Sequence, residues 1–108
     1  MTRTLEADNL INGYRAPQVI KAITVGAGTY LRGMAIGQIS GAFKQIGEAT
    51  YTVDTIYAIV AETTTLTEEG KIEVYLTGEF NKDCVFVKEG TTVENLIIPG
   101  RKLGLFIS

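Results

Sequence analysis

The clearest pattern of hydrophobic and polar positions lies in the segment KIEVYLTGEF, residues 71–80. Apolar and polar side chains alternate along it, which is typical of a strand with one face in a core. The core face is predicted to hold Ile72, Val74, Leu76 and Phe80, and the outer face Glu73, Tyr75, Thr77 and Glu79. We therefore expect a half-buried strand whose outer face meets solvent or a neighbouring subunit.

Further strands are expected where β-branched and apolar residues gather between turn-forming residues. The candidate segments are VIKAITV (19–25), DTIYAIVAE (54–62), CVFVKEG (84–90) and RKLGLFIS (101–108), the last as a strand or an extended tail. Glycines and polar residues in SGAFKQIG, residues 40–47, suggest a turn and a short hairpin connection. Most of the chain is thus expected to be β-structure.

One segment near the C-terminus has a sequence pattern typical of a helix. Thr91 followed three residues later by Glu94 forms a capping-box pattern, and Pro99 with Gly100 predicts the end of the helix. The apolar face of this helix is predicted to consist of Val93, Leu96 and Ile97. Together with the strands, this pattern predicts a mainly β fold with one or two short helices, an α+β single domain that is β-barrel-like.

The glycine-rich stretch TVGAGTYLRGMAIG, residues 24–37, invites comparison with phosphate-binding loops. Gly26 and Gly28 match the first two glycines of a dinucleotide fingerprint, but Leu31 occupies the third position. Gly33 and Gly37 would weaken any helix that followed, by about 1 kcal/mol each relative to alanine. We therefore interpret these glycines as turns, bulges or points of close backbone approach.

Composition and charge narrow the classes of partner. The 108 residues are 45% hydrophobic and 20% charged, which fits one globular domain. The 10 Lys and Arg and the 12 Asp and Glu are dispersed, so we expect no nucleic-acid partner. No apolar run approaches the roughly 20 residues that span a bilayer, and we expect a soluble protein without a membrane partner, made in the cytoplasm.

The residues that could carry chemistry are sparse. The chain has no histidine, so Ser40, Ser108 and Cys84 lack the usual base of a nucleophilic site. As the single cysteine, Cys84 rules out an internal disulfide and is interpreted as a small buried residue. We expect no catalytic site, no metal and no cofactor.

Residues 1–15 differ from the rest of the chain because they are mostly polar. Leu5, Leu10, Ile11 and Tyr14 still provide apolar anchors that a fully solvated tail would not need. We therefore divide the chain into an N-terminal arm, residues 1–15, and a β-rich domain, residues 16–108. Deleting the chain through Tyr14 is expected to leave the domain folded.

Four segments resemble, in the same order, the lambda-type phage head decoration protein family. They are GTYLRGMAIGQI, YAIVAETTT, IEVYLTGEF and PGRKLGLFI, and the correspondence runs from about Ala16 to Ile107. The resemblance implies a small β-tulip domain that forms homotrimers, with a dimer as the second choice. It further implies binding to the major capsid protein at three-fold sites of the expanded icosahedral head, on the outer surface of the virion.

In the resembling family the N-terminal arm engages the capsid, which here points to a set of candidate contacts. These are Thr2, Arg3, Leu5, Leu10, Ile11, Tyr14 and Arg15. The arm is shorter than the family pattern and contains less proline. Two other interpretations of the chain stay open, a small-ligand-binding β-barrel and a hydrolase with carboxylates that the sequence does not single out.

Overall fold

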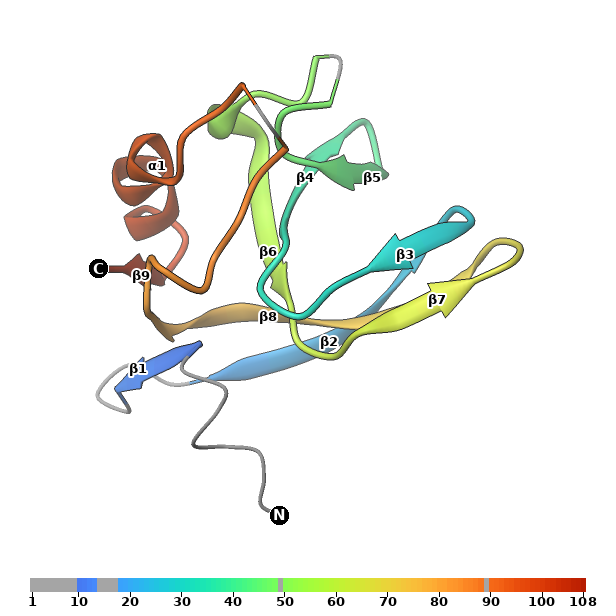
Figure 1. The fold of residues 1–108 in the computed structure, drawn as a ribbon, viewed down its shortest axis with the longest axis horizontal. Helices are drawn as coiled ribbons and strands as arrows, with labels where there is room; N and C mark the ends of the chain where they lie inside the picture. Colours follow the sequence, from blue (N-terminus) through green and yellow to red (C-terminus); the bar gives the residue numbers. More distant parts are fainter. Residues whose placement is uncertain (1–9, 14–17, 49, 89) are drawn as a thin grey trace.

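Nine strands form within residues 10–13, 18–48, 50–88 and 90–108, the part of the chain that this computed structural model describes (Figure 1). The strands are β1 Ile11–Gly13, β2 Val19–Val25, β3 Gly28–Tyr30, β4 Ala35–Ile39, β5 Ala42–Gln45, β6 Ile56–Val60, β7 Thr64–Leu66, β8 Gly70–Phe80 and β9 Leu105–Ile107. The helical segments are 3₁₀ turns at Val53–Thr55 and Val93–Leu96 and the helix α1, Ile97–Arg101. The expected mainly β domain with a short helix is confirmed.

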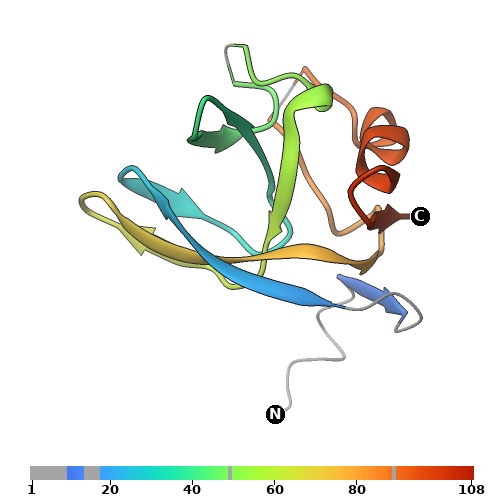
Figure 2. The same ribbon diagram turned by 180° about the vertical axis from the view of Figure 1, so that it is seen from behind.

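Strand β8 joins most of the structure. Strand β2 pairs antiparallel with most of β8, and β6 pairs with the middle of β8. Strand β1 and the parallel strand β9 pair with the end of β8. Strands β4 and β5 continue this seven-stranded sheet beyond β6, while β3 and β7 form a separate pair. In the described part of the chain the sheet is not closed into a barrel, so the β-barrel-like part of the expectation is wrong. Figures 1 and 2 show the β3–β7 pair beside β2 and β8.

Two hydrophobic clusters fill the domain, and β8 contributes to both. Ile72 and Val74 pack in one cluster with residues of β2, β4 and β6. Tyr75 and Phe80 pack in the other, beneath α1 and β9, with their ring centroids 5.5 Å apart. Strand β8 therefore contributes side chains from both of its faces to the core, although Lys71 and Glu73 in its first half are exposed.

The predicted faces of β8 are correct only for its first half. Val19 lies opposite Thr77 but the next residue, Ile20, lies opposite Tyr75, which leaves Leu76 as an extra residue in β8. An extra residue of this kind is a β-bulge, and it moves all later side chains to the opposite face. Phe80 therefore shares a cluster with Tyr75, which is buried and not on an outer face, while Leu76 is half-buried.

The C-terminal helix starts and ends differently from the prediction. Thr92, not Thr91, is the residue before the 3₁₀ turn, and no side chain caps it, so the capping box is absent. Pro99 and Gly100 lie inside α1, because a proline in the first turn of a helix removes a donor that has no partner there. The predicted apolar face is confirmed, since Leu96 is buried and its two companions pack against the same cluster.

The glycines of residues 24–37 act as the expected geometric elements. Gly33 has a φ of +96°, donates to the carbonyl of Val60 and accepts from the amide of Phe86. A Cβ at Gly33 would overlap the carbonyl oxygen of Cys84, which is half-buried. The segment containing Phe86 makes one isolated bridge, to Met34, in place of the expected strand.

Replacing Gly33 by alanine is expected to destabilise the fold, because alanine is strained at this φ and its Cβ has no room. We expect Gly33→Ala to lower the free energy of unfolding by at least about 1 kcal/mol in urea titrations followed by circular dichroism. Gly26→Ala is the matched control, because no atom lies within 4 Å of a Cβ there, and should change it by less than about 0.5 kcal/mol. Equal effects of both substitutions would contradict this role of Gly33.

Candidate functional site

The candidate capsid contacts from the arm fall into two groups. Leu10 is 1% exposed in the cluster that contains Phe80, and its carbonyl accepts a hydrogen bond from the amide of Asn81 at 2.7 Å. Ile11 pairs with Phe80 and packs against the same cluster. The other candidates, Thr2, Arg3, Leu5, Tyr14 and Arg15, lie outside the described residues.

The folded domain therefore begins no later than Leu10, and the boundary placed after residue 15 needs correction. No hydrophobic period in this polar segment marks Leu10 and Ile11 as core residues. Their burial follows from long-range pairing with the end of β8. Leu10 is thus not accessible as a capsid contact in this fold.

Strand β2 presents an exposed apolar edge. Its first four residues are exposed on both faces, including Val19 and Ile20, and among the described strands it pairs only with β8. An open edge with apolar side chains is a surface on which another polypeptide can pack or pair. We call Val19 and Ile20 the edge patch.

A second apolar surface lies at α1 and β9, at the other end of the domain from the tips of β3 and β7 (Figure 1). Ile98, Leu103 and Phe106 are exposed there, with Ile98 at 67%, and Arg101 and Lys102 lie between them in sequence. Leu103 also borders a shallow groove of about 440 Å³ between the start of β6 and the bulged part of β8. We call Ile98, Leu103 and Phe106 the helix patch.

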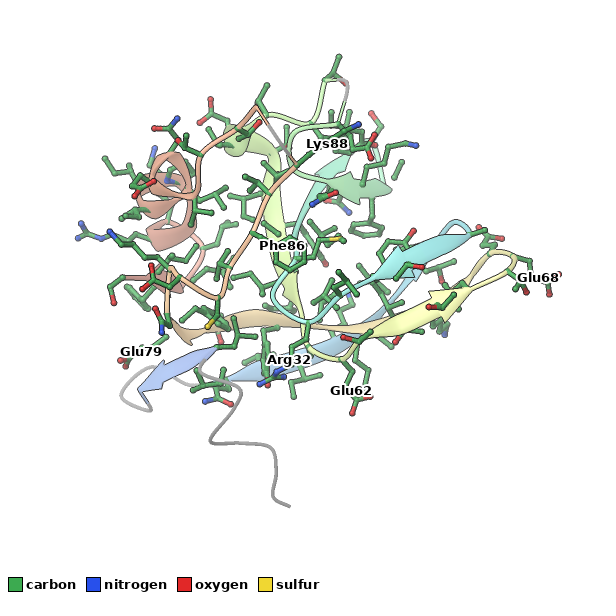
Figure 3. The ribbon with its side chains drawn as sticks, viewed as in Figure 1. Arg32, Glu62, Glu68, Glu79, Phe86 and Lys88 are labelled. Atoms are coloured by element: carbon green, nitrogen blue, oxygen red, sulfur yellow. The ribbon has the colours of Figure 1, made fainter. Side chains whose placement is uncertain are left out.

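Arg32 connects three segments of the chain through hydrogen bonds. The sequence pattern did not identify this residue. Its Nη1 donates to the carbonyl of Ala61 and to the hydroxyl of Tyr75 at 3.3 Å, and its guanidinium lies 5.7 Å from the centroid of that ring. Its backbone amide donates to Thr63 Oγ1 at 3.0 Å. Figure 3 shows Arg32 beside β8. A half-buried arginine with these partners positions the backbone around Gly33.

A larger groove of about 680 Å³ opens between β3 and β5. Buried Val25 and Met34 and half-buried Tyr30 and Phe43 line it, and two carboxylates, Glu48 and Glu69, border it. The Tyr30 hydroxyl donates to the carbonyl of Gly26 at 2.7 Å, and burial raises the pKa of Tyr30. The groove is thus lined by apolar and polar side chains together.

The described residues contain no group of three His, Cys, Asp or Glu side chains that could hold a metal ion. Within the same part of the chain, no helix is long and apolar enough to cross a membrane. Comparison with protein-family models and with curated proteins gave no match to this chain.

The placement of Leu10 generates a stability prediction. Leu10→Ala should lower the free energy of unfolding by about 2 to 5 kcal/mol, because it opens a cavity in a packed cluster. Ile20→Ala, at an exposed position in β2, is the comparison and should cost less than about 1 kcal/mol. Chemical denaturation of the full-length variants measures both. A Leu10→Ala protein as stable as the parent would place the arm outside the core.

Proposed function

We propose that this chain is a phage capsid decoration protein. It binds the outside of the expanded icosahedral head at three-fold sites as a homotrimer and stabilises the shell against the pressure of the packaged DNA. The observation that carries the proposal is the ordered resemblance of four sequence segments to the lambda-type family.

The four resembling segments include residues that define the packing of the domain. Arg32 and Gly33 of the first segment anchor the turn before β4, and Ala58 and Ala61 of the second segment are buried. In the third segment, Tyr75 and Phe80 pack together across Gly78, whose φ is +148°. These positions are thus ones that this fold requires, and the proposed function follows from the sequence resemblance.

A protein that cements a shell works through contact area. Near-permanent interfaces bury about 2,000 Å² or more, and many copies on a symmetric shell add weak contacts together. The edge patch on β2 and the helix patch on α1 and β9 provide apolar surface for contacts between copies and with the major capsid protein. The proposal needs neither a catalytic group nor a cofactor, and it places the protein on the virion surface.

The proposed self-association can be tested with two variants that each add one negative charge. Ile98→Asp in the helix patch should weaken trimer formation or head binding at least tenfold, because burying an isoleucine contributes about 1.5 to 3 kcal/mol. Asn95→Asp adds the same charge at an exposed position one turn earlier and should have little effect. Analytical ultracentrifugation and co-sedimentation with expanded, undecorated heads measure the two steps. Equal binding by both variants would remove the helix patch from the interface.

Co-sedimentation of the parent protein tests the function itself. We expect it to pellet with expanded heads, to saturate at three copies per local three-fold site, and to bind unexpanded heads poorly. Failure to pellet with expanded heads would contradict the proposed function.

A further inference from the structure

Two separate parts of the domain surface carry opposite charge. Residues 62–73, which contain β7 and the start of β8, include four glutamates and one lysine, and all five side chains are exposed. Residues 97–108, which contain α1 and β9, include one arginine, one lysine and no acidic residue. Figures 1 and 2 show α1 and β7 on different sides of the domain. Such a distribution allows one copy to contact another through surfaces of opposite sign.

The helix patch combines exposed apolar side chains with positive charge. Ile98, Leu103 and Phe106 are 67%, 46% and 41% exposed. Arg101 and Lys102 are exposed between them in sequence, and neither has an ion-pair partner among the described residues. A partner that covers this patch therefore needs apolar surface with carboxylates beside it.

The acidic residues near the helix patch do not cancel its charge. Glu94, in the 3₁₀ turn before α1, lies 3.8 Å from Lys82. Glu79, which is opposite Phe106 in the register of β8 and β9, is half-buried and takes part in another interaction of the chain. The two basic side chains beside the helix patch are therefore available for carboxylates of a partner.

The β3–β7 pair has an outer face that fits this description. Tyr30 and Leu66 from this pair pack against a hydrophobic cluster of the domain. Thr29 and Thr65 are exposed instead, and their hydroxyl oxygens lie 3.5 Å apart. Leu31 is 43% exposed and follows Thr29 by two residues, which is the spacing of one face of a strand. We call Thr29, Leu31 and Thr65 the ribbon face.

Glutamates flank the ribbon face. Glu62 precedes β7 and Glu68 follows it, and Figure 3 shows both side chains pointing away from the domain. Both are exposed, and the structure gives neither an ion-pair partner within the part of the chain that it describes. The ribbon face thus combines a leucine and threonine methyl groups with negative charge, which complements the helix patch.

We propose that the helix patch of one copy packs on the ribbon face of a second copy, with Arg101 and Lys102 beside Glu62 and Glu68. The two surfaces lie on different sides of a domain that measures 31 Å along its longest axis, so they do not meet within one folded chain. Contact between two different surfaces repeats in one direction from copy to copy, and it closes into a ring when the rotation between copies fits. Three such contacts give the three-fold ring that the proposed function requires.

The inference rests on the self-association in the proposed function, not on head binding. It assigns the helix patch to contacts between copies and names the surface that covers it. The edge patch on β2 then remains for contacts with the major capsid protein.

Charge reversal in the full-length protein tests the inference. Arg101→Glu together with Lys102→Glu should weaken self-association at least tenfold in analytical ultracentrifugation, because like charges then face each other. Glu62→Lys together with Glu68→Lys should weaken it at least tenfold for the same reason. A chain with all four substitutions should associate within about threefold of the parent, because each contact again joins opposite charges.

The control reverses two exposed lysines outside both surfaces, by Lys21→Glu together with Lys44→Glu. It changes the net charge as much as the helix-patch variant does and should alter self-association less than threefold. Circular dichroism checks that every variant folds. A four-substitution chain that associates as weakly as the two-substitution chains would overturn the inference. A control that weakens association as much as they do, or a parent that stays monomeric, would overturn it as well.

The outcomes separate this inference from the proposed function. Restored association of the four-substitution chain, in a protein whose parent fails to bind expanded heads, would support the paired surfaces and contradict decoration. Head binding by the parent without restored association would support decoration and overturn the contact between the helix patch and the ribbon face.

Discussion

The bulge in β8 is the constraint on which the rest of the structure depends. Because Leu76 is an extra residue opposite β2, the strand sends Ile72 and Val74 into one cluster and Phe80 into the other. The same change of face brings the end of β8 between β1 and β9 and places Phe80 against Tyr75. A strand without the bulge would leave the second cluster without its largest buried side chain.

The sequence predicts those features that depend on local pattern. The alternation up to Val74, the apolar face around Leu96 and the geometric role of Gly33 are each local, and the structure confirms them. The buried Tyr75 and Leu10 depend on partners far along the chain, so periodicity could not reveal them. The role of Arg32 was missed for the same reason, because its acceptors lie 29 and 43 residues away.

The surfaces of the domain give the proposed decoration function a physical basis. Its interior is organised around β8, while apolar side chains are exposed on β2, on β9 and at α1, and among the described residues β3 and β5 each pair with one strand beside a groove. Apolar patches and open edges are costly on a protein that acts alone and useful on one that works by packing against copies and a shell. In the proposed function, the stabilisation of the shell increases with the area that these surfaces bury.

The central claim is that this chain occupies three-fold sites on an expanded phage head. The most direct measurement is a cryo-electron microscopy reconstruction of expanded heads saturated with the protein, compared with the same heads before addition. The account predicts new density on the outer surface at every local three-fold site, into which three copies of the described domain fit. Unchanged density at those sites, or added density centred elsewhere on the shell, would contradict it.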